Sequence, residues 1–521
     1  VTVRHAERLQ DDGMLYTVAL RSARATDQYT LAADGPVTLE PAFTFHGFQY
    51  VEITGVAAPP APEQVVGVVI HNDIPRAAVF EASDPLLTKL ASNIVWGQKG
   101  NYLEAPTDCP QRDERLGWTG DAQFFMPTAL YTADIGAFHT KWLVDLVQDS
   151  QHENGSFAHV SPDVGIGAGA VAWGDAALIC PYLMHRFYGD TRVIERHFDN
   201  LVKGMDFLTR TSADHIRKDL GFGDWLNLGG GAKDEVICTA YYAYLARIMS
   251  EMAGVIGRNE DAARYAELYG SIRDAFIKAF VSDDGAILES SQTGYALAFA
   301  FDLLPEEKRA GAAKHFEAEV ARFDNHLATG FIGTPRLLPA LVAAGKEDIA
   351  YRLLMNKTYP SWLYQVTLGA TTMWERWNGW TPEQGFADPG MNSFNHYAFG
   401  AVGEFLYSHV AGIAPLQTAF RTVQVRPRPG GGLTSARLAH RCIRGEIVSD
   451  WKLDGGKMRL TVVIPQNTDA VICLPTNAPE AVTEGGQPAA AVFGKNIRAE
   501  NGETVIRCGG GSYAFELPYA G

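Results

Sequence analysis

Long hydrophobic runs are missing from this 521-residue chain, and so are the features of a leader peptide. No stretch of eighteen or more apolar residues occurs, so the sequence predicts no helix that spans a bilayer. Residues 1–5 do not predict a secretory signal, which needs a basic start, an apolar stretch and a cleavage site of small residues. The chain begins without methionine and inside an alternating pattern. We therefore expect that sequence upstream of Val1 is missing, and the compartment, cytoplasmic or secreted, stays open.

Cysteine is scarce, and no cysteine has the spacing of a metal site or a redox motif. Most of them stand in apolar stretches, which is typical of buried free thiols. One disulfide among the last three stays open as an alternative. No His, Cys and Asp cluster has the spacing of catalytic metal ligands, so we predict no metal and no other cofactor. The cysteines are Cys109, Cys180, Cys238, Cys442, Cys473 and Cys508.

Positive charge is in short supply. Lysine and arginine number 44 against 60 aspartates and glutamates, which gives a net charge of -16. An acidic surface repels phosphate groups, and no basic patch forms along the sequence. We therefore expect neither nucleic acid nor a membrane as a partner, and we expect a neutral substrate. A homodimer is compatible with the sequence, which does not give the oligomeric state.

The chain is too long for one ordinary core, and the period of its apolar residues changes twice. Residues 1–75 predict β-structure, with alternation at 15–20 and 43–53 and an apolar strand at 65–70. We interpret this part as a β-sandwich, the C-terminal part of a larger accessory region.

Residues 76–415 have apolar residues at helical spacing, with almost no strand pattern between them. About a dozen helices in one large domain favour an α/α toroid. A solenoid is disfavoured because no repeat of fixed period occurs. The clearest helical stretches are 135–147, 193–208, 175–188, 235–256, 260–281, 306–322, 334–344, 346–357 and 395–410.

Residues 416–521 return to the β period, with glycine clusters between short strands, and predict a C-terminal β-sandwich. The predicted fold class is therefore a central all-α domain flanked by β-sandwich domains. The strands expected here are 420–425, 444–451, 458–464, 470–474, 504–507 and 512–517.

Residues 105–121 are unlike the rest of the chain. They hold four carboxylates, two arginines and a tryptophan, while two prolines and two glycines prevent a regular helix across them. A solvated surface loop is the simple explanation. However, Leu116 and Trp118 would be costly to expose, and the flanking helices are strongly apolar. A charged loop pressed against a core favours a cleft with a function.

A second dense segment, residues 371–380, places three tryptophans around Glu375. An aromatic core with Glu375 paired to Arg376 is the alternative, but side chains adjacent on the chain rarely face each other. We expect burial among indoles to raise the pKa of Glu375. Aromatic faces stack on sugars, and a pair of carboxylates is what glycosyl transfer to water requires.

Three shorter pieces fit the same picture, although each is weak alone. The motifs 173–175 and 223–225 each combine a tryptophan with an aspartate beside a glycine, and such an aspartate is usually a helix cap. His396 follows Asn395 at the start of a predicted helix, where a capping or core role is the more common one.

Residues 108–121 closely resemble the signature of bacterial and fungal α-L-rhamnosidases, a family of glycoside hydrolases. Residues 374–377 and 395–396 are similar to that family too, and residues 45–51 resemble the β-sandwich before its catalytic domain. The resemblance runs along the whole chain. It implies an (α/α)6 catalytic barrel, here residues 76–415, and hydrolysis of terminal α-L-rhamnose with inversion.

The resemblance also implies a role for each matching residue. Glu114 corresponds to the general acid and Glu375 to the general base. The family's substrate-binding positions correspond to Asp108, Arg112, Trp118, Asp121, Trp173, Trp225 and His396. No metal takes part. The partner is a rhamnose-containing glycoside or polysaccharide, whose aglycone stays open.

On this reading Glu114 donates a proton to the glycosidic oxygen, and Glu375 is ionised and holds the attacking water. Three alternatives remain. One is a toroid glycosidase for another sugar, such as an unsaturated glucuronyl hydrolase or a trehalase-like enzyme. A polysaccharide lyase would need a basic cleft, which the charge of -16 disfavours. A non-catalytic carbohydrate-binding protein would not need both glutamates.

Overall fold

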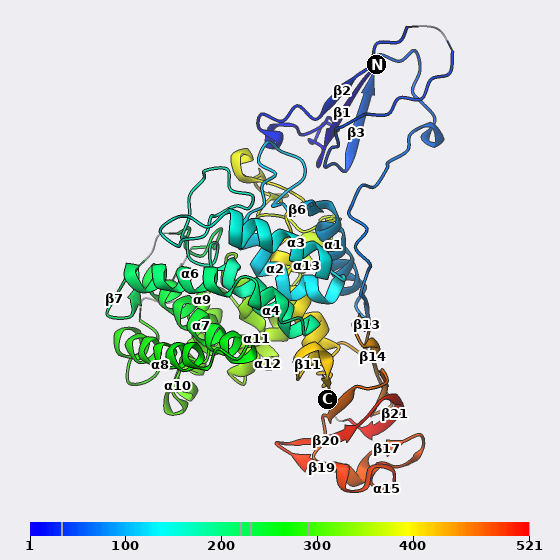
Figure 1. Ribbon diagram of the computed structural model, residues 1–521. Coiled ribbons are helices and arrows are strands. Elements are labelled where there is room, and N and C mark those ends of the chain that lie inside the picture. Colours follow the sequence, from blue (N-terminus) through cyan, green and yellow to red (C-terminus); the bar gives the residue numbers. More distant parts are fainter. Residues whose placement is uncertain (33–34, 219–220, 230–231, 289–290, 520–521) are drawn as a thin grey trace.

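A computed structural model describes residues 1–521 except 33–34, 219–220, 230–231, 289–290 and 520–521. Three parts follow one another along the chain (Figure 1). A small N-terminal sheet, drawn in blue, lies beyond one end of a helical body. The C-terminal sheets, drawn in orange and red, lie beyond the other end.

The N-terminal part is a three-stranded antiparallel sheet in the order β2-β1-β3. In its register, Arg4 of the central strand lies opposite Glu52. Its strands are β1 (Thr2–Ala6), β2 (Thr26–Gln28) and β3 (Tyr50–Thr54), and its 3-10 turns are η1 (Val18–Leu20) and η2 (Pro62–Gln64).

The strands predicted in this part are largely wrong. Residues 15–20 form one isolated bridge, between Leu15 and Leu9, and then curl into η1. Only the end of the 43–53 run joins the sheet, and Phe43 at its start has φ of 59°, which is not strand backbone. Residues 65–70 are exposed and pair with no strand among the described residues. Alternation alone does not make a strand where no partner strand lies beside it.

The helical body begins at α1, where Asp84 caps the first turn by accepting a hydrogen bond from the backbone N–H of Leu86. Helix α2 is buried along its whole length, so it lies at the centre of the body. The α-helices are α1 (Pro85–Asn101), α2 (Thr119–Thr132), α3 (Gly136–Val144), α4 (Ala176–Tyr188), α5 (Arg192–Glu195), α6 (Phe198–Thr211), α7 (Asp234–Val255), α8 (Asn259–Phe280), α9 (Gln292–Ala300), α10 (Glu306–Ala321), α11 (Thr334–Ala343), α12 (Glu347–Leu354), α13 (Trp362–Thr367) and α14 (Gly403–Phe405).

The predicted helix at 395–410 is split into several types of turn. A 3-10 segment, η5 (Tyr397–Val402), precedes α14, and a π segment, η6 (Leu406–Val410), follows it. A Cβ at Gly403 would lie 2.5 Å from Thr128 Cγ2 of α2. The irregular turns therefore occur where this segment packs closely against α2. The other irregular turns of the body are η3 (Asp145–Asp149) and η4 (Pro389–Met391), and its short strands are β5 (Tyr102–Leu103), β6 (Ala105–Pro106), β7 (Ser212–Ala213), β8 (Ile216–Arg217), β9 (Trp380–Thr381) and β10 (Gly385–Phe386).

The C-terminal part holds two sheets, in the orders β18-β17-β21-β15-β14-β13-β4 and β11-β12-β16-β20-β19. Each strand expected from the sequence is present within a few residues. Strands β11, β13, β17, β18 and β19 were not predicted. The strands are β11 (Ile413–Pro415), β12 (Thr422–Val425), β13 (Ser435–Cys442), β14 (Gly445–Asp454), β15 (Lys457–Ile464), β16 (Asp469–Leu474), β17 (Thr483–Glu484), β18 (Gln487–Pro488), β19 (Ile497–Glu500), β20 (Glu503–Cys508) and β21 (Gly511–Pro518); between them lie η7 (Thr418–Phe420), η8 (Pro479–Ala481), α15 (Ala489–Phe493) and η9 (Gly494–Asn496).

One strand of the larger sheet comes from before the helical body. Strand β4 (Ala78–Ala82) pairs antiparallel with β13, so Phe80 lies opposite Leu438. The segments that enter and leave the helices therefore meet in the same sheet.

Two predictions from composition concern the whole chain. No disulfide joins any of the six cysteines, as predicted; four of them are buried, whereas Cys442 and Cys508 are only partly buried. Among the described residues, no helix combines the length and the apolarity needed to cross a membrane.

Candidate active site

The charged motif is an irregular loop that leads from β6 into the buried helix α2. Asp108 closes the loop, because its Oδ1 accepts a hydrogen bond from the backbone N–H of Leu116 at 2.8 Å. Gly117 passes so close to the backbone of Ser161 that a Cβ would lie 2.1 Å from that carbonyl oxygen. The loop is thus pressed against the body, as the composition of the motif predicted.

Arg112 is the centre of the site. It is fully buried, and its guanidinium binds Glu375 through two nitrogens at 2.9 and 3.3 Å. The Nη2 atom also lies 2.7 Å from Glu114 Oε2 and 3.8 Å from Asp108 Oδ2. One guanidinium therefore joins the two predicted catalytic glutamates and a predicted sugar-binding aspartate.

Glu114 is the more accessible of the two glutamates, with 16% of its side chain exposed against 1% for Glu375. Its Oε1 accepts a hydrogen bond from Trp118 Nε1 at 2.8 Å, and its Oε2 accepts one from Arg21 at 3.0 Å. Arg21 belongs to the N-terminal part and was not predicted, because nothing near it in the sequence marks it.

Glu375 is buried and surrounded by donors. Besides Arg112, the backbone N–H of Ser393 donates to its Oε2 at 2.8 Å. Burial alone would raise the pKa of Glu375, but His396, Arg112 and the Ser393 amide outweigh it and lower the pKa. The predicted increase was therefore wrong, because the analysis considered the neighbouring indoles and not the cations that fold against Glu375.

His396 donates to or accepts from Asp121 across 2.7 Å, and both side chains are buried. Burial opposes its charge, but Glu375, Asp121 and Asp108 raise the pKa of His396 to about 9. The imidazolium is thus a second cation inside the site at neutral pH.

Asp108 differs from the other acids of the site. Burial, helped by Glu114 and Asp121 and opposed by His396, raises its pKa to about 7. Its Oδ2 has no hydrogen-bond partner among the described residues. This oxygen is closed off from solvent and lies 3.8 Å from Arg112 Nη2.

The three tryptophans predicted to bind substrate lie around a phenylalanine that was not predicted. Phe222 lies 5.8 Å from the ring of Trp118, 4.8 Å from Trp173 and 6.0 Å from Trp225, each in an edge-to-face arrangement. Phe222 directly precedes the 223–225 motif, and its aromatic character was the only available signal. The four rings form one aromatic wall, as stacking on a sugar requires.

The aspartates beside two of these tryptophans are structural. Asp224 accepts hydrogen bonds from the backbone N–H groups of Gly330, Ile332 and Gly333 at 2.9 to 3.0 Å. Asp175 forms a buried ion pair with Arg217 at 2.9 Å. Neither aspartate caps the helix that follows it in the sequence: Asp175 makes no side-chain cap hydrogen bond to α4, and Asp224 binds backbone groups more than a hundred residues away.

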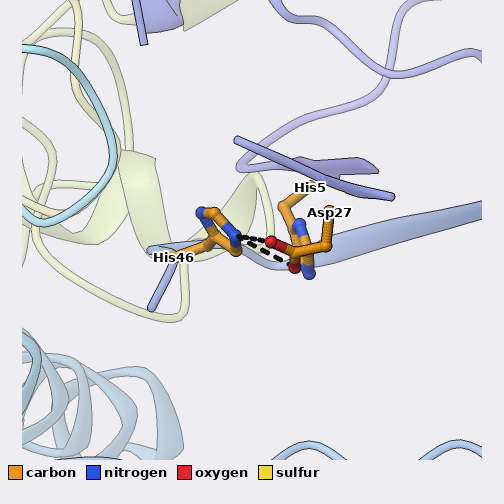
Figure 2. Close-up of side chains that lie close together, drawn as sticks. All are labelled: His5, Asp27 and His46. Carbon is orange, nitrogen blue, oxygen red and sulfur yellow. Dashed lines mark hydrogen bonds and ion pairs between the residues drawn. The ribbon is translucent and has the colours of Figure 1, made fainter. Parts of the chain in front are cut away.

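Two groups of side chains among the described residues have the types and proximity of metal ligands, although their sequence spacing gave no sign of it. Asp108, Cys109 and His396 form one group inside the site, where burial raises the pKa of the Cys109 thiol well above its usual value. The other group lies in the N-terminal part, and Figure 2 shows His5, Asp27 and His46 together there. His46 already pairs with both oxygens of Asp27 at 3.1 Å.

Family models match nearly the whole chain. The bacterial α-L-rhamnosidase 6 hairpin glycosidase domain matches residues 75–410. The C-terminal domain of the same proteins matches residues 412–488, and their concanavalin-like domain matches residues 1–71. The six-hairpin match confirms the predicted (α/α)6 body with β-domains at both ends.

Curated relatives and solved structures agree with these matches. α-L-Rhamnosidases of Streptomyces avermitilis and Formosa agariphila are 45% and 40% identical over 99% of this chain, which covers 49% and 57% of their lengths. The Streptomyces avermitilis α-L-rhamnosidase complexed with L-rhamnose superposes with a TM-score of 0.95 at 45% identity, over 99% of this chain and 49% of that one.

The α-L-rhamnosidase from Dictyoglumus thermophilum superposes with a TM-score of 0.94 at 33% identity, over 99% of this chain and 59% of that one. The chain thus spans about half the length of these two curated relatives. On this evidence the chain belongs to the bacterial α-L-rhamnosidase family of six-hairpin glycoside hydrolases.

Proposed function

We propose that the protein is an α-L-rhamnosidase that hydrolyses terminal α-L-rhamnose with inversion, with Glu114 as general acid and Glu375 as general base. The observation that carries the proposal is the cluster around Arg112, in which one buried guanidinium joins both glutamates. A pair of carboxylates beside an aromatic wall has the chemistry for glycoside hydrolysis. The relative that binds L-rhamnose supports the choice of sugar.

The charges at Glu375 suit a general base. Its pKa is lowered, so the carboxylate is ionised at neutral pH and can accept a proton from a water molecule. His396 and Arg112 stabilise that negative charge. The water would attack the anomeric carbon from the side opposite the leaving oxygen.

Glu114 is the better candidate for the acid, because it is the accessible member of the pair and can reach a leaving group. Its Oε2 and Glu375 Oε1 contact the same nitrogen of Arg112, at 2.7 and 3.3 Å. These two oxygens therefore lie closer than the roughly 6.5 Å that separates the carboxyl groups of inverting enzymes. We propose that sugar binding moves Glu114 away from Arg112, which makes room for the water.

Recognition of rhamnose would use the remaining residues. Trp118, Trp173 and Trp225, together with Phe222, would face the methyl group and the ring C–H groups. Asp108 Oδ2, which has no hydrogen-bond partner among the described residues, would accept a hydroxyl of the bound sugar. A sugar that left such buried groups unpaired would bind less tightly.

The first test is hydrolysis of p-nitrophenyl α-L-rhamnoside by the purified chain, with the glucoside, galactoside and glucuronide as controls. Release from the rhamnoside alone is the expected result. Release from a control instead would assign a different sugar. If the folded protein releases p-nitrophenol from none of the four substrates, the proposed activity is refuted for this chain.

Two variants and one spectrum test the mechanism. Glu114→Gln should lose activity on substrates with poor leaving groups and keep more of it on the activated aryl glycoside, whereas Glu375→Gln should lose both. Equal losses for Glu114→Gln on both substrates would remove Glu114 from the acid role. Proton NMR of the first sugar released should show the β-anomer, and the α-anomer would indicate retention.

A further inference from the structure

The N-terminal part touches both segments that carry the candidate catalytic glutamates. Arg21 binds Glu114 at 3.0 Å and its neighbour Asp113 at 2.8 Å. A Cβ at Gly47 would lie 2.6 Å from the ring of Pro110, so the backbone of the N-terminal part presses on the motif loop. The N-terminal part, through segments outside its three strands, is therefore in contact with the candidate active site.

Glu7 is the deepest of these contacts. It follows β1 directly, only 8% of it is exposed, and its Oε2 accepts a hydrogen bond from the backbone N–H of Phe394 at 3.0 Å. Its Oε1 is buried and has no hydrogen-bond partner among the described residues. Burial raises the pKa of Glu7 to about 8, against the Phe394 amide and Arg112. The side chain is therefore largely neutral at pH 7.

Phe394 belongs to the segment that orients Glu375. The residue before it, Ser393, donates its N–H to Glu375 Oε2 at 2.8 Å and accepts the Glu375 N–H at 2.9 Å. The N–H of His396, two residues after Phe394, donates to the carbonyl of Met373 at 2.8 Å. Residues 373–375 and 393–396 thus form a short ladder that carries the base and the imidazolium.

Arg8 strengthens the same contact. Its guanidinium carbon lies 5.4 Å from the ring of Trp374, 5.6 Å from Trp380 and 5.4 Å from Phe394. These distances are in the range of cation–π attraction. Glu7 and Arg8 therefore hold both sides of the segment that bears Glu375.

The strand that carries Glu7 is itself fixed. His5 Nδ1 lies 3.2 Å from the carbonyl oxygen of Ala25, and the His5 ring stacks on His46 at 4.3 Å. His46 in turn pairs with Asp27 of β2 (Figure 2). Three segments of the N-terminal part thus hold the end of β1, so Glu7 has a rigid base.

We propose that Glu7 is a positioning residue for Glu375: it holds the Phe394 amide, and through the adjacent Ser393 amide it sets the direction of the Glu375 carboxylate. Glu7 touches no reacting atom in this assignment. The inference rests on the proposed function, because it needs Glu375 to act as the base. It adds that the N-terminal part of the chain is a working component of the catalytic site.

Substitutions of Glu7 test the hydrogen bond that its side chain accepts from Phe394. Glu7→Gln keeps a neutral side chain with an acceptor for Phe394, so kcat for p-nitrophenyl α-L-rhamnoside should stay within about threefold of the unchanged chain. Glu7→Ala removes the acceptor, and a base displaced by about 1 Å loses on the order of 10- to 100-fold in kcat. KM should change by less than about threefold, because the aromatic wall and Asp108 are untouched.

Glu7→Asp shows whether a loss of activity comes from the missing hydrogen bond or from a chain that fails to fold. It keeps the carboxyl group but is one methylene too short to reach Phe394, so its kcat should fall as in Glu7→Ala while the chain stays folded. The acidic limb of the kcat profile should also move to higher pH in both variants. Loss of the Ser393 amide raises the pKa of Glu375, which otherwise faces Arg112, His396 and Glu7.

Glu52→Ala is the matched control, since Glu52 is a carboxylate of the same sheet that pairs only at the surface, with Arg4 at 3.0 Å. Its kcat should not change. An unchanged kcat in Glu7→Ala, or equal losses in Glu7→Gln and Glu7→Ala, would overturn the assignment. An unchanged chain that releases no nitrophenol from the rhamnoside would overturn the proposed function, and this inference with it.

Discussion

Replacement of Arg112 by methionine tests whether the site is held together by charge. Arg112 and Glu375 are both almost fully buried, and the guanidinium is 2.9 Å from Glu375. Removing one partner of such a pair leaves an unpaired buried charge, which costs about 3–5 kcal/mol of unfolding free energy. In a chain of this size the unfolding entropy is about 1.1 kcal/mol/K, so the loss should lower Tm by roughly 3–5 °C, measured by differential scanning calorimetry at pH 7.

The double variant Arg112→Met with Glu375→Gln decides the cause. With the unpaired charge gone, at least about 2 kcal/mol of the loss should return. Arg459→Met is the control, because its pairs with Asp454 and Glu516 are exposed and worth under about 1 kcal/mol. If Glu375→Gln restores no stability to the Arg112→Met chain, the loss comes from packing and the electrostatic reasoning is wrong.

Three further outcomes are expected. The pKa of His396 is raised to about 9, so its charge stabilises the fold fully below pH 6.5. In urea unfolding, the free energy of unfolding should exceed that of His396→Gln by an amount that shrinks as pH rises through 9. A difference that stays constant with pH would contradict this. Asp224→Ala should lose about 3 kcal/mol or more by the same method, because three backbone N–H groups lose their acceptor, and a smaller loss than for an exposed aspartate would be inconsistent with that role. Phe222→Ala should raise KM for the rhamnoside at least about threefold with little change in Tm, and an unchanged KM would exclude Phe222 from the sugar wall.

The fold was predictable where the sequence pattern is local. Helical spacing identified α7 and α8, and alternation identified β14 and β15, because each of these elements packs one face on a core. The same reasoning failed at residues 65–70. That run is apolar throughout except for one glycine, but it pairs with no strand among the described residues. Pairing is a tertiary property that a single segment does not encode.

The site was predictable where its residues stand in dense motifs. Glu114 and Arg112 share one loop, and Glu375 stands among tryptophans, so local composition marked each of them. Glu7 and Arg21 carry no such mark. Glu7 contacts a residue 387 positions away, and Arg21 contacts one 93 positions away, so only the folded chain reveals them.

The depressed pKa of Glu375 shows the same limit. The sequence indicated burial among indoles, which acts to raise the pKa. It did not indicate that Arg112 and His396, 263 and 21 residues distant, would converge on the same carboxylate. Electrostatics depends on which charges meet, and that is decided by the packing of the helices.

Strand β4 gives the molecule a property that its linear order hides. Because β4 pairs with β13, the polypeptide between Phe80 and Leu438 forms a closed ring, fastened by backbone hydrogen bonds where it starts and stops. This segment cannot unfold from either end unless the hydrogen bonds between β4 and β13 break. The helical body therefore depends on the C-terminal sheet for this pairing, and a chain that ended at the last helix would leave β4 without its partner strand.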